Sequence, residues 1–144
     1  MAVRETQAAL IFTGRHADAT AAAVTAALGL QPSYSHESGD PHQSARLATS
    51  GTTKESKWIL REERTAGSDE DFHGMRSLDR LAERLEPYAE SIRTLRTDYW
   101  VIVDLYASSD TSQGGFFVSQ ETMRRLGLLE VPFVPSVYCF DDEK

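Results

Sequence analysis

The chain has 144 residues, of which 40% are hydrophobic and 26% charged, with a formal net charge of -7. This is the composition of a folded protein rather than a disordered one, and the length fits one domain better than two. The acidic balance argues against nucleic acid as a partner, because phosphate binding requires a basic stripe. A single cysteine, Cys139, excludes an intramolecular disulfide and a thiolate zinc site within one chain.

No apolar run approaches the roughly 18 residues of a membrane-spanning helix, and the N-terminus lacks an apolar leader segment. We therefore expect a cytoplasmic protein with no membrane partner. Arginine outnumbers lysine and alanine is abundant, which hints at a GC-rich bacterial genome. Residues 1–140 are expected to form one α+β domain, and residues 141–144 an acidic C-terminal tail.

The N-terminal half predicts strands around one short helix. A buried strand is expected over residues 8–12, followed by a helix with Asp18 as N-cap and Gly29 as the glycine that ends it. Residues 33–56 are ambiguous between one strand and two: 33–37 can be a strand, 44–47 can pair back, and 50–56 has the composition of a turn or loop. Residues 57–62 predict a strand with Trp58 and Leu60 on one face and Ile59 and Arg61 on the other.

The C-terminal half predicts the strongest helix and the strongest strand. Residues 65–71 are expected to be a loop, and the apolar spacing from Met75 predicts an amphipathic helix that Pro87 interrupts or kinks. Residues 99–106 predict a strand in which only Asp104 breaks the apolar run. A short strand at 116–118, a helix from Ser119 to Leu126 closed by Gly127, and a last strand at 136–140 complete the chain.

The resulting order predicts an α+β fold. The first six elements match a ferredoxin-like (split βαβ) antiparallel sheet with helices on one face, extended by a C-terminal β-α-β unit. The strand order within the sheet is not determined by the pattern.

Several of these features occur together in a known family. They are Leu28-Gly-Leu-Gln-Pro32 at the end of the first helix, Gly39-Asp40, a lone Trp58 on a strand, a leucine-spaced helical stretch to about residue 96, and Tyr138 on the last strand. In these the chain resembles the bacterial domain of unknown function 4279 family over nearly its whole length. The resemblance implies a compact α+β domain, and it brings no activity, cofactor or catalytic residues.

The motifs of the common catalytic and cofactor-binding sites are absent, so no catalytic residue and no cofactor is expected. His36, Asp40 and His42 are the weak candidates for a metal site, since imidazole and carboxylate bind divalent metals, but their spacing fits no known loop. A solvated turn explains them as well, and no metal is predicted.

A ligand or partner patch is the alternative kind of site. Asp104 shares a strand face with Trp100 and Tyr106, and a carboxylate in an apolar strand must be paired or have a raised pKa. Trp58 can line a pocket, although tryptophan at the centre of a strand usually lies in a core. Asp40 and His73 complete the patch, the latter as a pH-sensitive contact beside Asp69-Glu-Asp71. Cys139 is expected to be a buried, inert thiol.

Three functions are consistent with this sequence. The first is a non-catalytic binding module, protein-binding or regulatory, for example an acidic inhibitor or immunity-like protein that docks onto a basic surface. The second is a small-molecule-binding protein or a hydrolytic enzyme with a carboxylate–histidine site formed by Asp104 or Asp40 with His36, His42 or His73. The third is a structural homodimer formed through an edge strand.

Overall fold

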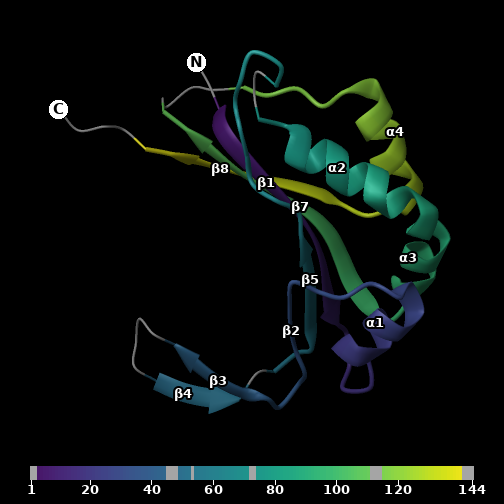
Figure 1. Cartoon of the computed structure of the whole chain (residues 1–144). Coiled ribbons are helices and arrows are strands. Elements are labelled where there is room, and N and C mark those ends of the chain that lie inside the picture. Colours follow the sequence, from purple (N-terminus) through teal and green to yellow (C-terminus); the bar gives the residue numbers. More distant parts are fainter. Residues whose placement is uncertain (1–2, 45–48, 53, 72–73, 111–114, 141–144) are drawn as a thin grey trace.

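The computed structural model is α+β, with a mixed six-stranded sheet and the helices on one of its faces (Figure 1). It describes residues 3–44, 49–52, 54–71, 74–110 and 115–140, and within 42–52 only the backbone. In chain order the elements are β1 (Val3–Gly14), α1 (Ala21–Leu28), β2 (Tyr34–His36), β3 (Pro41–Ser44), β4 (Thr49–Thr52), β5 (Lys57–Arg61), β6 (Thr65–Ala66), α2 (Arg76–Leu85), η1 (Glu86–Tyr88), α3 (Ala89–Leu95), β7 (Tyr99–Ser109), α4 (Gln120–Leu129) and β8 (Phe133–Cys139).

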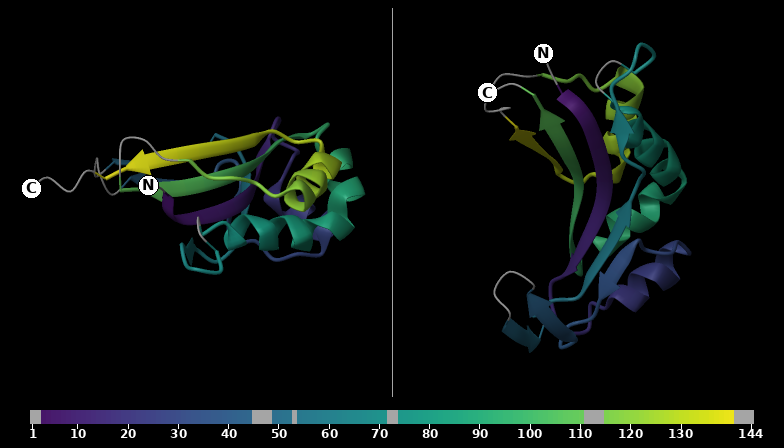
Figure 2. Two further views of the ribbon diagram at one scale, coloured as in Figure 1. Left: turned by 90° about the horizontal axis from the view of Figure 1, so that it is seen from above. Right: turned by 60° about the vertical axis from the view of Figure 1, so that its left-hand side comes forward.

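The strands of the main sheet lie in the order β2-β5-β1-β7-β8, and β6 pairs with the start of β1. The pairs β2–β5, β5–β1 and β1–β7 are antiparallel, whereas β7 and β8 are parallel. The four strands β2, β5, β1 and β7 are thus antiparallel, and the parallel pair occurs at the edge formed by the C-terminal unit, which was expected to extend an antiparallel sheet. A parallel neighbour needs a crossover connection, and α4 provides it between β7 and β8. Figure 2 shows the sheet edge-on, with the helices on a single side.

The hydrophobic core lies between the sheet and the helices. The largest fully buried side chains include Phe12 and Trp58 from the sheet and Leu78, Leu81 and Leu85 from α2. Phe12 meets Trp58 edge-to-face, with ring centroids 5.5 Å apart, and the Trp58 indole N–H donates to Thr25 Oγ1 at 3.0 Å. One of the two tryptophans, Trp58, is therefore buried in the core.

Helix α1 begins two residues later than predicted. Its N-cap is Thr20, whose hydroxyl accepts a hydrogen bond from the Ala23 N–H, so Asp18 is not the cap. The predicted end is confirmed, because Gly29 has φ +69° and its N–H donates to the Thr25 carbonyl.

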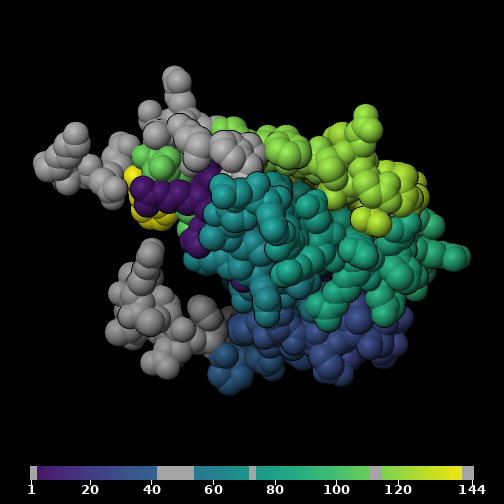
Figure 3. All heavy atoms as spheres, turned by 45° about the horizontal axis from the view of Figure 1, so that its top comes forward, coloured from purple at the N-terminus to yellow at the C-terminus, as the bar shows by residue number. Residues whose placement is uncertain are grey.

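Pro87 divides the long amphipathic stretch as predicted. Helix α2 ends at Leu85, the single turn η1 carries the proline, and α3 continues to Leu95. Proline is tolerated in such a first turn because its missing N–H would have no intrahelical partner there. In the space-filling view, α1, α2, α3 and α4 form one continuous packed surface (Figure 3).

The segment between β2 and β5 contains more strand than predicted. β3 and β4 pair as a separate two-stranded hairpin, so residues 49–52, expected to be part of a turn, form a strand instead. Residues 45–48, most of the segment predicted to pair back, lie outside the described residues. The hairpin extends from the end of the sheet at which β5 begins, on the side away from the helices (Figure 1).

Two expectations for the C-terminal unit are wrong. Residues 116–118 form no strand, although Phe116 and Val118 pack on the core, because β8 occupies the edge of β7. The helix capped by Ser119 continues past Gly127 to the fully buried Leu129 and ends at Glu130, which has φ +53°. The expected β-α-β extension is thus reduced to α4 and β8. Residues 65–66 form a short strand rather than a loop.

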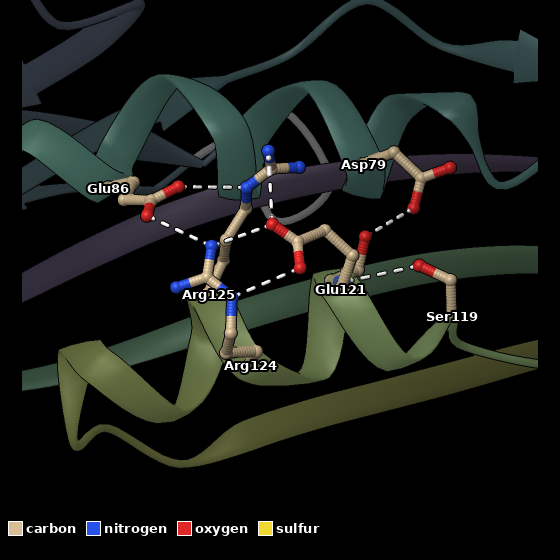
Figure 4. Close-up of polar contacts among 7 residues, drawn as sticks. Asp79, Glu86, Ser119, Glu121, Arg124 and Arg125 are labelled. Carbon is tan, nitrogen blue, oxygen red and sulfur yellow. Dashed lines mark hydrogen bonds and ion pairs between the residues drawn. The ribbon is translucent and has the colours of Figure 1, made fainter.

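Hydrogen bonds and ion pairs fix α4 to the other helices. The Thr122 hydroxyl donates to Asp79 Oδ1 at 2.7 Å, and Arg124 and Arg125 both bind Glu86, at 3.0 and 2.9 Å (Figure 4). The Arg125 and Arg124 guanidiniums hold the pKa of Glu86 below its usual value. Asp79 stands three residues after Arg76 on α2, but the two do not pair: Asp79 accepts the Thr122 hydroxyl, and Arg76 lies 3.7 Å from Glu70.

Candidate open-face site

The face of the sheet that no helix covers is the candidate site, and we call it the open face (Figure 2). Side chains alternate between the two faces of each strand. Phe12, Trp58 and Val103 point into the core from β1, β5 and β7. The residues that alternate with them along each of these strands therefore point to the open face. The open-face residues in register across β2, β5, β1, β7 and β8 are Tyr34, His36, Lys57, Ile59, Arg61, Glu5, Gln7, Ala9, Ile11, Thr13, Trp100, Ile102, Asp104, Tyr106, Ser108, Val134, Ser136 and Tyr138.

Asp104 and Arg61 lie on the two sides of one small residue. Both pair with Ala9 of the central strand, which places their Cα atoms roughly 10 Å apart across the sheet. Partial burial raises the pKa of Asp104, and the positive charge of Arg61 opposes that rise. A raised pKa is one of the two outcomes expected for a carboxylate in an apolar strand, and Asp104 lies on the same face as Trp100 and Tyr106.

Aromatic rings and arginines meet in two places on this face. The Arg15 guanidinium lies 3.5 Å from the centroid of Trp100, whose exposed fraction is 59%. The Arg64 guanidinium lies 4.9 Å from the centroid of Tyr106, which itself stacks on Tyr138 at 5.3 Å. These are favourable cation–π and stacking arrangements, and they hold flat rings and planar cations in place at the surface.

The centre of the open face is apolar and already closed. Ile59, Ile11 and Ile102 lie side by side across β5, β1 and β7. Ile59 is only 7% exposed, although no helix covers it, so the surrounding side chains of the same face close over it. Aromatic and cationic side chains therefore surround this apolar strip, in which Ile11 and Ile102 are partly exposed.

The cations of the two faces differ in their partners. In the helix layer, six arginines each form an ion pair with a glutamate: Arg76, Arg80, Arg84, Arg96, Arg124 and Arg125. Among the described residues, no carboxylate lies within 4.0 Å of the charged atoms of Arg15, Lys57 or Arg61. Arg64 pairs with Glu5 at 3.0 Å. Within the described residues, the open face thus carries Arg15, Lys57, Arg61 and Arg64 against the carboxylates of Asp104 and Glu5, on a chain whose net charge is -7.

The predicted patch is only partly assembled. Trp100, Asp104 and Tyr106 share the open face, as the sequence indicated, but Trp58 is fully buried on the opposite face and cannot contact a ligand there. Asp40 stabilises the turn after β2, where its carboxylate accepts the Glu37 N–H at 2.7 Å. His73 lies outside the described residues.

Neither of the predicted histidine sites is formed by the described residues. His36 lies on β2, three strands from Asp104, which is roughly 14 Å across the sheet. The side chain of His42 lies outside the described part of the chain, and within that part no three histidine, cysteine or acidic side chains are placed to hold a metal ion. A histidine–carboxylate contact does occur elsewhere, between His16 Nε2 and Asp98 Oδ1 at 3.0 Å, on side chains about half exposed.

Sequence reasoning missed several residues of the open face. Arg61 was placed on the face opposite Trp58 by alternation, but nothing in the sequence showed that this face lacks a cover. Arg15 and Tyr138 are brought to Trp100 and Tyr106 by the pairing of β1 and β8 with β7, which no local signal records. Cys139, expected to be buried, is exposed because β8 is an edge strand that extends beyond the helices.

A family model, Domain of unknown function (DUF4279), matches residues 4–140. The chain belongs to this family. No curated protein and no solved structure matches it. The DUF4279 match covers every strand of the open face except the first residue of β1. Within the described residues, no helix of this DUF4279 protein is long and apolar enough to cross a bilayer.

Proposed function

We propose that the chain is a non-catalytic, protein-binding module whose open face docks an acidic and partly apolar segment of another protein. The observation that carries this proposal is a set of three cations, Arg15, Lys57 and Arg61, that form no ion pair within the described residues and lie among exposed aromatic rings. Tryptophan, tyrosine and arginine are the residue types that contribute most to protein–protein binding energy. Unpaired cations complement carboxylates of the partner.

The charge distribution favours an acidic partner over the basic one expected from net charge alone. Several acidic side chains of the helix layer, such as Glu86 and Glu121, form ion pairs with arginines of the same layer, which reduces the negative charge that this layer presents. On the described part of the open face cations outnumber carboxylates, which is opposite in sign to the net charge of the chain. The carboxylates of Asp104 and Glu5 and the overall charge of -7 disfavour a polyanion such as nucleic acid.

Two further points of the proposal concern the fold and the setting. We propose a ferredoxin-like core, which the strand order β7-β1-β5-β2 with antiparallel neighbours supports. We also propose the cytoplasm of a bacterium as the setting, for which an exposed unpaired cysteine is compatible with a reducing compartment.

Binding of labelled peptides tests the function. One probe alternates aspartate with leucine and phenylalanine, a second replaces each aspartate with lysine, and a third is a single-stranded oligonucleotide of similar length. Fluorescence anisotropy at low and high salt measures each. We expect the acidic peptide to bind, with an affinity that falls as salt rises, and the lysine peptide to show no saturable binding.

Charge-reversed variants connect the binding to the open face. Arg61→Glu and Lys57→Glu should each weaken the acidic peptide by at least about fivefold. Arg76→Glu changes the net charge equally but lies on the helix layer, and should leave the affinity within about twofold. Equal losses in the Arg61 and Arg76 variants, tighter binding of the oligonucleotide, or a stable homodimer by light scattering that Arg61→Glu dissociates would each contradict the proposal.

A further inference from the structure

A hollow of about 200 Å³ lies at one end of the open face, beside the part of β7 that β8 does not reach. β8 pairs with β7 only from Phe133, opposite Val103, so the preceding residues of β7 have no strand on that side. The residues lining the hollow are Arg15, Arg96, Tyr99, Trp100, Val101, Ile102 and Pro132. Two arginines and a tryptophan are therefore among the residues around one small space.

The backbone of β7 contributes a donor to this hollow. In an antiparallel ladder the N–H groups of successive residues point alternately to one neighbour and to the other. The Val103 N–H points away from β1, since it donates to the Pro132 carbonyl at 2.9 Å. The Val101 N–H points the same way, into the hollow, and Val101 is only 5% exposed. A backbone donor that has no strand partner can donate to an acceptor at this place.

The charges around the hollow are predominantly positive. Arg15 is held over the Trp100 ring and forms no salt bridge with the described residues. Arg96 contacts Glu130 at 3.3 Å, but both side chains are about half exposed, and an exposed pair of this kind holds its arginine weakly. The nearest other acid in sequence, Asp98, is bound to His16. Arg15 can therefore bind a ligand in its present position. Arg96 can also bind one, because breaking its exposed ion pair with Glu130 costs little free energy.

We propose that this hollow binds a small oxyanion, a carboxylate or a phosphate, carried on a flat apolar body. Arg15, Arg96 and the Val101 N–H bind the oxygens, since guanidinium and backbone N–H groups make strong charge-assisted hydrogen bonds to oxyanions. Trp100, Ile102 and Pro132 contact the apolar body. A cavity of about 150 Å³ accepts a benzene ring, so this hollow has room for a ring with its acidic group.

This site does not rest on the docking proposed above. Arg15 takes part in both proposals, but Arg96, the C-cap of α3, belongs to the hollow alone, and Lys57 and Arg61 belong to the docking surface alone. Failure of one proposal therefore leaves the other intact, and a variant of Arg96 separates them.

Titration with benzoate, phenyl phosphate and neutral benzyl alcohol tests the site. Calorimetry gives the affinities, and the amide resonance of Val101 in a ¹⁵N-labelled sample reports whether the ligand reaches that N–H. We expect at least one of the two anions to bind with a Kd on the order of 1 mM and to shift the Val101 resonance. Benzoate alone identifies a carboxylate site, phenyl phosphate alone a phosphate site, and both a general oxyanion site.

Variants of the two arginines decide between this site and nonspecific binding. Arg15→Gln and Arg96→Gln should each weaken the anion by at least about fivefold, and Arg15→Lys should keep part of the affinity because the charge remains. Arg76→Gln, an arginine of similar exposure on α2, should leave the affinity unchanged, and thermal melts check that every variant is folded. The proposal is overturned if benzyl alcohol binds as tightly as the anions, if neither anion saturates by about 20 mM, or if Arg15→Gln and Arg76→Gln bind alike.

Discussion

The two tryptophans lie on opposite faces of the sheet, so the substitutions Trp58→Phe and Trp100→Phe should have very different effects on stability. Trp58 is fully buried and donates to the Thr25 hydroxyl. Phenylalanine loses that hydrogen bond, about 1 kcal/mol, and leaves space that costs about 1 kcal/mol more. Trp58→Phe should therefore lower the free energy of unfolding by about 2 kcal/mol, or roughly 6 °C in Tm for a domain of this size.

Trp100→Phe should cost under about 1 kcal/mol, because the side chain is 59% exposed and only the contact with Arg15 weakens. Urea and thermal unfolding measure both values. Since the chain has two tryptophans, each variant leaves a single fluorophore. Iodide should quench Trp100 in the Trp58→Phe protein and leave Trp58 in the other variant nearly unquenched. Equal quenching of the two, or equal losses of stability, would refute the assignment of the faces.

Three further predictions concern single positions. Asp104→Asn should raise Tm at pH 7. Burial raises the pKa of Asp104, so the stability that this group contributes is lost as pH rises through that pKa, and a neutral asparagine avoids the loss. The increase in Tm should disappear near pH 3, where Asp104 is itself protonated. Glu86→Gln should lower Tm at pH 7, because Arg125 and Arg124 lower the pKa of Glu86 and its contribution is lost as pH falls; a melt at low pH should show no difference. Gly74→Ala should lower the free energy of unfolding in urea by about 3 kcal/mol, and Gly29→Ala by about 1 kcal/mol. Both glycines have positive φ, but only at Gly74 would a Cβ lie 2.6 Å from the Thr65 carbonyl oxygen. Similar losses in the two variants would contradict this reasoning.

The sequence predicted those features whose cause is local. Pro87 interrupts the long helical stretch because its ring and missing N–H act within one turn, and Gly29 ends α1 because its own φ is positive. The faces of β5 and β7, with Trp58 opposite Arg61 and Asp104 beside Trp100, follow from alternation along each strand. For these residues the immediate neighbours in the chain contain all the information required.

The features that were missed depend on residues far apart in the chain. Residues 116–118 alternate in burial like a strand, but β8 occupies the edge of β7, and only the tertiary structure shows this. Helix α4 passes Gly127 because Leu129 packs in the core, which outweighs the preference of glycine for a helix end. The ion pairs of Glu86 join residues 38 and 39 positions apart, and no helical spacing predicts them.

Net charge averages over two faces of this chain whose local charges differ. In the helix layer, some arginines and glutamates form ion pairs that join helices, such as Arg125–Glu86. Within the described residues, the cations Arg15, Lys57 and Arg61 form no ion pair, and strand alternation and one turn place them on the open face. An acidic chain can therefore present a cationic surface, since a partner within a Debye length of about 8 Å meets the local charges rather than the total. The register of the sheet determines which charged side chains lie together on the open face. It places Arg61 on one side of Ala9 and Asp104 on the other.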